Sequence, residues 1–275
     1  ILLIMAVLSG SSSGRQRSGR SMESLFDGKT LEGWEVKGGT AKYHVEDGAI
    51  VGTTVEGSPN TFLCTKKNYG NFMLVFEVKV DPVLNSGVQI RSHTYKKDKK
   101  LTIWRNGKKR EQLRKAGTVF GYQVEIAKAS GGVSGGIWDE ARKAMWLYDA
   151  KTNEAAAKAM KDNEWNEFRV LAIGDRIRTW VNGVACADFR DPVDQSGFIG
   201  LQVHSFKGDR PARVRWRNIK IRSFGTSTWR PIFDGKTLDG WHTLPGGKWD
   251  IADGVVTGTS SSSESRHGLL VTDKK

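Results

Sequence analysis

Residues 72–80, Phe-Met-Leu-Val-Phe-Glu-Val-Lys-Val, carry the strongest fold signal in the chain. This run is almost continuously apolar and rich in β-branched and aromatic residues, as in a strand covered on both faces. Most other candidate strands are short, alternate apolar with polar residues and end at Gly, Asn or Asp. They are 42–52, 86–93, 119–127, 166–173, 176–182, 198–204 and 213–222. Only residues 153–162 have a helical composition. The pattern predicts an all-β sandwich or jelly roll.

The composition excludes several classes of protein. With 275 residues, 32 Gly and 6 Pro, the chain can form one large domain or two small ones with many tight turns. No stretch reaches the roughly 18 apolar residues of a membrane helix, so no integral membrane segment is expected. Cys64 and Cys186 are too few for a disulfide framework or a structural zinc site. The sequence leaves undecided whether these two cysteines form a disulfide with each other.

The positive charge is concentrated in one segment. Lys and Arg outnumber Asp and Glu by 43 to 30, which gives a formal net charge of +13. Residues 96–115 hold ten of these bases, with Asp98 and Glu111 as the acids. This segment reads either as a solvated loop between strands or as a docking surface for an anionic polysaccharide. No nucleic-acid motif accompanies it, so nucleic acid is not an expected partner.

An internal repeat divides the chain. Phe26–Trp34 recurs as Phe233–Trp241, and 42–53 recurs as 248–259. We therefore predict a β-sandwich domain over 23–224 and the start of a second, truncated copy over 229–275. Residues 1–22 open with a short apolar run followed by small and polar residues, which predicts a signal-peptide remnant and a flexible lead-in. A secreted or periplasmic bacterial protein is expected.

Three strands share a polar pattern. In a strand, residues i and i+2 point to the same side. The three triplets therefore predict a sheet face that carries an Arg, a Glu and a His, each next to a Gln, unless these are ordinary solvent-facing positions. They are Gln89-Ile90-Arg91, Gln123-Val124-Glu125 and Gln202-Val203-His204. Such a face, with aromatic platforms, suits a sugar.

A second candidate feature follows the Glu125 strand. The Gly-rich segment 134–142 contains Trp138, Asp139, Glu140 and Arg142. These residues are expected either at the lip of a cleft or at a surface turn with a local ion pair. Trp180 and Asn182, at an Asn-Gly hairpin signal, complete the predicted substrate-binding residues.

The order and spacing of these motifs resemble the 3-keto-disaccharide hydrolase domain family. The resemblance runs from about residue 24 to 223 and starts again at 231. It is carried by Phe26–Trp34, Asn85–Ser92, Gly121–Ile126, Gly136–Arg142, Glu164–Arg169, Trp180–Gly183, Gly200–His204 and Trp216–Ile221. It implies a concanavalin A-like jelly-roll β-sandwich, secretion in bacteria and action on sugars oxidised at C3, as a lyase, hydratase or net hydrolase. The basic insertion and Trp138, where a Tyr is common, depart from the family pattern.

The implied chemistry assigns roles to the polar face. A ketone at C3 acidifies the C2 hydrogen, so a base can remove it and the resulting enediolate expels the group on C1. His204 or Glu125 is the candidate general base, and Arg91 the candidate oxyanion holder. Alternatively His204 and Glu125, with Asp139 or Glu140, hold a divalent metal ion. The rival function is a non-catalytic carbohydrate-binding module on the same fold.

Overall fold

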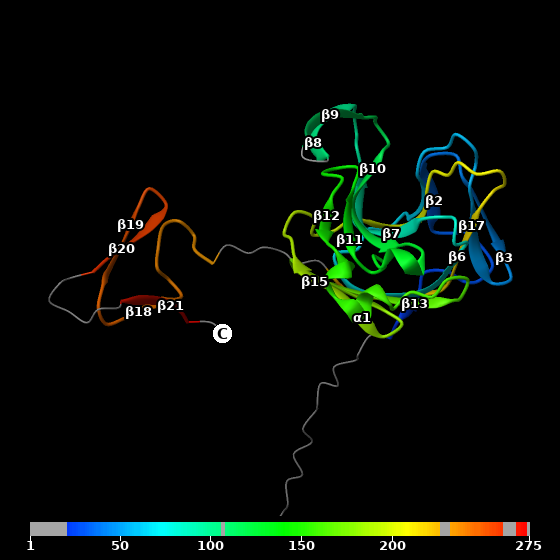
Figure 1. The fold of residues 1–275 in the computed structure, drawn as a ribbon. Coiled ribbons are helices and arrows are strands. Elements are labelled where there is room, and N and C mark those ends of the chain that lie inside the picture. Colours follow the sequence, from blue (N-terminus) through cyan, green and yellow to red (C-terminus); the bar gives the residue numbers. More distant parts are fainter. Residues whose placement is uncertain (1–20, 106–107, 226–231, 261–267, 274–275) are drawn as a thin grey trace, which may run out of the picture. The chain divides into compact units, whose positions relative to one another are not determined.

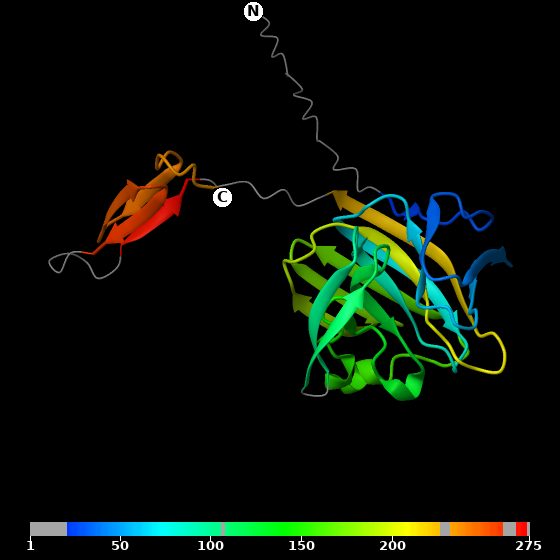
Figure 2. The same cartoon turned by 90° about the horizontal axis from the view of Figure 1, so that it is seen from above.

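The computed structural model describes residues 21–105, 108–225, 232–260 and 268–273. The chain divides into two units, with the boundary between residues 227 and 228. The first unit consists of two antiparallel sheets packed face to face, so the predicted all-β jelly-roll sandwich is confirmed (Figures 1 and 2). Most of the expected signal-peptide remnant lies outside the described residues.

One sheet has eight strands. Its order is β15-β14-β13-β6-β17-β4-β3, and β1 also pairs with β17. The strands are β1 (Glu23–Ser24), β3 (Lys42–Glu46), β4 (Ala49–Thr53), β6 (Asn71–Val80), β13 (Asn166–Ile173), β14 (Arg176–Val181), β15 (Val184–Arg190) and β17 (Arg213–Gly225).

The other sheet has seven strands in the order β12-β11-β10-β7-β16-β5-β2. They are β2 (Trp34–Gly38), β5 (Thr61–Thr65), β7 (Ser86–Thr94), β10 (Val119–Ile126), β11 (Ile137–Glu140), β12 (Trp146–Tyr148) and β16 (Phe198–Val203). Consecutive strands such as β6 and β7, or β16 and β17, lie in opposite sheets. The chain therefore crosses repeatedly between the two layers, as in a jelly roll.

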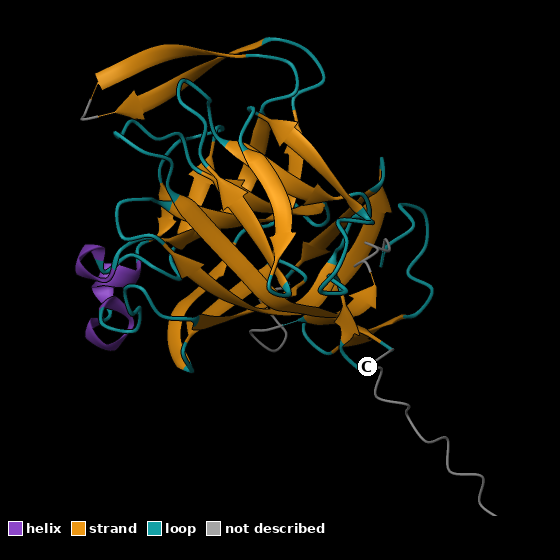
Figure 3. Ribbon diagram, turned by 90° about the vertical axis from the view of Figure 1, so that its right-hand side faces the viewer, coloured by secondary structure: helices purple, strands orange, loops and turns teal. Residues whose placement is uncertain are grey.

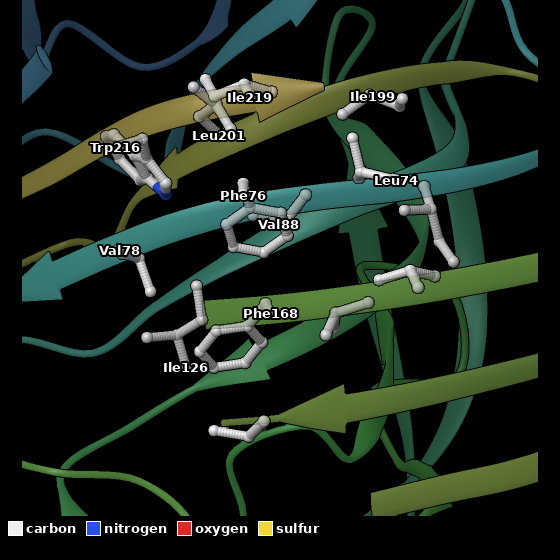
Figure 4. Packing of buried hydrophobic residues seen from close by; sticks show 14 of the residues in the cluster. Leu74, Phe76, Val78, Val88, Ile126, Phe168, Ile199, Leu201, Trp216 and Ile219 are labelled. Carbon is white, nitrogen blue, oxygen red and sulfur yellow. The ribbon is translucent and has the colours of Figure 1, made fainter. Parts of the chain in front are cut away.

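The main core lies between the two sheets. Figure 4 shows Leu74, Phe76 and Val78 of β6 beside Phe168 of β13, with Val88 and Ile126 of the other sheet nearby. The rings of Phe76 and Phe168 stack with their centroids 5.3 Å apart. Burial alternates strictly along β6, so the expectation that this strand is covered on both faces is wrong. Its second face, which carries Met73, Val75, Glu77 and Lys79, is only half-buried.

Two local predictions are corrected. The segment 42–52 is not one strand, because Asp47 and Gly48 take positive φ angles of 50° and 71° and turn the chain between β3 and β4. The helix expected at 153–162 is one turn, α1 (Glu154–Ala157), capped by the Asn153 side chain. Two short 3-10 turns, Ala129–Gly131 and Ala150–Thr152, precede it, and the helical segments gather at one edge of the sandwich (Figure 3).

The basic segment is more ordered than a loop. It forms a two-stranded hairpin of its own, β8 (Lys99–Arg105) and β9 (Lys108–Arg114), which extends from one end of the sandwich (Figure 1). Tyr95 stacks on Phe120 with ring centroids 4.3 Å apart just before the hairpin, which anchors its base to β10. The hairpin is therefore held above the seven-stranded sheet.

The second unit repeats the strand pairing of the first. Its strands are β18 (Trp241–Leu244), β19 (Lys248–Ala252), β20 (Val255–Thr259) and β21 (Leu269–Thr272). Trp241 pairs with Thr272 as Trp34 pairs with Thr65. Asp234 accepts hydrogen bonds from the backbone of Lys236 and Thr237, as Asp27 does from Lys29 and Thr30. The sequence repeat is thus also a repeat of local structure.

The two cysteines do not form a disulfide. Cys64 lies in β5 and Cys186 in β15, so they belong to different sheets, and both are buried free thiols. Burial raises the pKa of Cys186 to about 11, so this thiol is protonated at neutral pH. No helix among the described residues is long and apolar enough to cross a membrane.

Candidate active site

A hollow of about 250 Å³ lies on the outer face of the seven-stranded sheet. Strand alternation produces it: Val88, Val124 and Ile137 point into the core, and their neighbours point outward. The hollow is lined by Asn85, Gln123, Glu125, Trp138, Glu140, Trp146 and His204. Four predicted strand or lip residues of the site, Gln123, Glu125, Trp138 and Glu140, therefore come together with His204.

Glu125 is the central ionisable group of the hollow. Its side chain accepts a hydrogen bond from the Asn85 amide at one carboxylate oxygen and from Gln123 Nε2, at 2.9 Å, at the other. Burial raises the pKa of Glu125 to about 7, against the lowering effect of these two amides, and the nearby charge of Glu140 raises it further. A carboxyl with a pKa near neutrality can both take and return a proton.

A relay of neutral side chains fixes the Glu125 carboxylate. Ser92 Oγ donates to Gln89 Oε1 at 2.7 Å, Gln89 Nε2 donates to Gln123 Oε1 at 2.8 Å, and Gln123 donates to Glu125. Gly87 makes room for it, because a Cβ at this position would lie 2.5 Å from the Gln123 side chain. Gln89 is thus buried beneath the hollow and orients Gln123 instead of lining the surface.

Glu140 and His204 form the rim opposite Glu125. Asn60 Nδ2 donates to Glu140 Oε1 at 3.1 Å, and Asn60 Oδ1 accepts from the Ser205 backbone N–H at 2.9 Å. Burial raises the pKa of Glu140, while the Asn60 amide and the charges of His204 and Arg114 act against this rise. His204 Nδ1 lies 2.7 Å from the Ser205 carbonyl. In the neutral ring Nδ1 then holds the proton and Nε2 keeps a lone pair.

Two tryptophans form one wall. Trp138 of β11 and Trp146 of β12 are cross-strand partners, and their rings meet edge to face with centroids 5.3 Å apart. Aromatic faces of this kind pack on the C–H faces of sugar rings. Sequence reasoning missed Trp146, Asn85 and Asn60. The eight-residue spacing of Trp146 from Trp138 is a hairpin signal for the first, whereas Asn60 is brought in only by tertiary contact.

The structure places Arg91 away from this face. The expectation that residues 89 and 91 point to the same side of the sheet is therefore wrong. Arg91 has a φ of 48°, and the register of β7 shifts at this point against both β10 and β16. The bulge breaks the alternation, so Arg91 does not follow Gln89. Its fully buried guanidinium donates to the carbonyls of Gly70, at 2.8 Å, and Gly174, at 2.6 Å. This is a structural role and gives no support for an oxyanion holder.

Four other predicted binding residues also lie elsewhere. Asp139 is fully buried on the core side of β11 and accepts from Arg142, which also donates to Asp194 at 2.7 Å. Trp180 lies in the eight-stranded sheet, under the Arg178 guanidinium. The remaining residue, Asn182, sits at the β14–β15 turn and donates to the Ala159 carbonyl.

Gln202 is not part of the lining of the hollow. Its side chain is fully buried beside Phe62, its cross-strand partner in β5, and does not reach the surface of the hollow. Neither of its polar side-chain atoms has a hydrogen-bond partner within the part of the chain that the structure describes.

The residues fit a metal ion poorly. Within the described ranges no group of three or more His, Cys, Asp and Glu side chains is arranged to hold one. Both Glu125 oxygens already accept amide N–H groups, which suits a hydrogen-bonded carboxylate better than a ligand. The pairing of His204 with Glu125 as metal ligands therefore gains no support from this arrangement.

A model of the 3-keto-alpha-glucoside-1,2-lyase-like domain matches residues 21–222 and 228–275. The chain belongs to this family. The resemblance seen in the sequence is thereby confirmed, and the family's carbohydrate-related, glycosyl hydrolase-like character applies to this chain at that general level.

Solved structures resemble the chain at low identity. A candidate glycosyl hydrolase from Parabacteroides distasonis ATCC 8503 is 21% identical, with 73% of this chain and 92% of that chain covered and a TM-score of 0.47. The carbohydrate-binding module CBM66 from Bacillus subtilis is 15% identical, with 70% and 96% covered and a TM-score of 0.45. A galectin-like protein of unknown function from Bacillus subtilis is 9% identical, with 70% and 90% covered and a TM-score of 0.44. No curated protein matches the sequence.

Proposed function

We propose that this chain is an enzyme that acts on 3-keto-glycosides, with Glu125 as the general base that removes the C2 proton. The observation that carries the proposal is the state of Glu125: a buried carboxyl with a pKa near 7, fixed by two amides in a sugar-sized, aromatic-walled hollow. Buried groups with such shifted pKa values are characteristic of acid–base sites.

The proposed reaction uses Glu125 and Glu140 in complementary roles. Glu125 takes the C2 proton, the electron pair moves toward the C3 carbonyl, and the enediolate expels the C1 oxygen. Glu140, whose pKa is raised by burial, gives its proton to that oxygen. The products are the free alcohol and a 2-hydroxy-3-keto-glucal. Water then adds at C1 while Glu140 takes a water proton and Glu125 returns its proton to C2, so the net reaction is hydrolysis.

Hydrogen-bond donors at the rim of the hollow are needed to stabilise the negative charge of the enediolate. With Arg91 directed elsewhere, we assign this role to Asn60, because its Nδ2 carries a second N–H besides the one donated to Glu140. His204 is not assigned this role, because its Nδ1 is already bonded to the Ser205 carbonyl and Nε2 of the neutral ring is an acceptor. Such donors stabilise charge most when water is excluded. A secreted or periplasmic location in a bacterium is also part of the proposal, because the sequence opens with an apolar run followed by small residues.

A carbohydrate-binding module is the second candidate. The Trp138–Trp146 wall and the polar rim favour it, because they can hold a sugar without any proton transfer. The two functions differ in whether Glu125 is required for turnover or only tunes binding.

Incubation of the purified chain with a 4-nitrophenyl 3-keto-glucoside separates the two. We expect nitrophenol release together with glucal absorbance, unchanged by EDTA, and a loss of at least about 100-fold in Glu125→Gln. Glu111→Gln, at an exposed carboxylate of the basic hairpin, is the matched control. Sugar binding without release in the unaltered chain would establish the binding module instead.

A further inference from the structure

A second and larger hollow adjoins the first beneath the basic hairpin. Its volume is about 590 Å³, and it is bordered by Asn60, Glu140 and Ser205 on one side and by Arg114 and Lys115 of the hairpin on the other. Glu140 lines both hollows, and Ser205 directly follows His204 of the first. A group attached to a sugar in the first hollow therefore has room in the second.

Arg114 is the cation best placed to act inside this space. Lys115 is already paired with Asp98 at 2.8 Å. Arg114 is only partly exposed, and its Nε is buried with no hydrogen-bond partner among the described residues. Its charge lowers the pKa of both Glu140 and Tyr95, so the guanidinium lies near these two side chains. A buried N–H of this kind lacks the acceptor that such groups normally have.

The floor of the second hollow suits a sugar ring. Phe62 and Val119 contribute to its lining and belong to a small apolar cluster on the outer face of the sheet. The hollow thus combines an apolar floor for C–H groups with a cation at its side. Arg binds planar and tetrahedral oxyanions through paired N–H groups, which Lys cannot match.

We propose that this second hollow is a leaving-group subsite for a sugar that bears a carboxylate or sulfate, with Arg114 as its anion-binding side chain. The assignment rests on the proposed function, because it takes Glu140 as the group that protonates the departing oxygen between the two hollows.

The test compares two 3-keto-glucosides with the same linkage, one carrying glucuronic acid and one carrying glucose as the leaving group. We expect the ratio of their kcat/KM values to favour glucuronic acid by about 10-fold or more at low salt, as a charge-assisted hydrogen bond predicts. Arg114→Met should bring this ratio close to one. Arg110→Met, at an exposed hairpin position outside the hollow, should leave the ratio within about twofold of that of the unaltered chain.

A binding measurement keeps the subsite and the activity distinguishable. Calorimetric titration with the unoxidised glucosyl-glucuronic acid, which cannot undergo elimination, should show binding that Arg114→Met weakens about 10-fold. Absence of turnover on both keto-glucosides with this binding intact would remove the proposed function and leave an anion-binding subsite. A kcat/KM ratio near one in the unaltered chain, or an equal loss in Arg110→Met and Arg114→Met, would overturn the subsite.

Discussion

Gln123 Nε2 donates a hydrogen bond of 2.9 Å to Oε2 of Glu125, two residues farther along β10. Both side chains lie on the outer face of the sheet because strand residues two apart share a side. Gln123 is itself held by Gln89, so it has only one orientation that satisfies both neighbours. The relay therefore fixes the position of Glu125 and holds its pKa below the value that burial alone would produce.

Gln123→Leu should disturb catalysis through Glu125. Loss of the donated hydrogen bond raises the pKa of Glu125 further, so the rising limb of the pH–rate profile should move to higher pH and kcat at pH 7 should fall about 10-fold. Gln112→Leu, on the basic hairpin, is the control. An unshifted profile in Gln123→Leu would show that the relay does not act on the catalytic group.

The unaltered chain should show a pH dependence set by Glu125. Since this carboxyl must be ionised to accept the C2 proton and a nitrophenolate needs no proton from Glu140, kcat/KM for the 4-nitrophenyl substrate should rise with pH and level off above about 7. Steady-state rates between pH 5 and pH 9 measure this directly. A profile that is flat across that range would remove Glu125 as the base.

Glu125→Gln should change the pH dependence of stability. The folded-state pKa of Glu125 is raised from 4.5 to about 7, so the bound proton contributes stability that is complete below about pH 4.5 and is lost as the pH rises through about 7. The Gln variant has no such loss, so its free energy of unfolding relative to the unaltered chain should rise between pH 4 and pH 9, by at most about 3 kcal/mol. Urea unfolding at the two pH values provides the comparison, with Glu111→Gln expected to show no such rise.

Trp146→Ala should weaken sugar binding. Removal of the ring deletes one half of the aromatic wall beside Trp138, and we expect an increase in KM of roughly 10-fold with a smaller effect on kcat. Trp180→Ala removes the same side chain from the opposite sheet and is the matched control. Equal losses in the two variants would mean that the wall is not the sugar platform.

Arg91→Met should separate stability from catalysis. The substitution leaves the carbonyls of Gly70 and Gly174 without their buried donor, so the free energy of unfolding should fall by about 3 kcal/mol. The rate per folded molecule should stay within about threefold. A fall in kcat of about 100-fold or more in the folded variant would restore Arg91 as the oxyanion holder.

Much of the fold follows from local sequence pattern. Alternation of apolar and polar residues decides which face of a strand is buried, so the strands at 86–93, 119–127 and 198–204 were predicted close to their observed bounds. The repeat of Phe26–Trp34 was likewise evident, and it matches a repeated strand pairing. The hairpin β8–β9 was not predicted, because its high charge hides the β pattern.

The sequence by itself determined the all-β class, the repeat and the shared face of Gln123 and Glu125, because these depend on a periodicity of two residues. Only the tertiary structure decided which distant residues join them. Asn60 reaches Glu140 and Ser205 because β5, β16 and β11 belong to one sheet, and the order of strands in that sheet is set by burial of the whole core. The bulge at Arg91 is likewise a property of its neighbours: β10 and β16 shift register there, and the side chain turns to carbonyls supplied by two other loops.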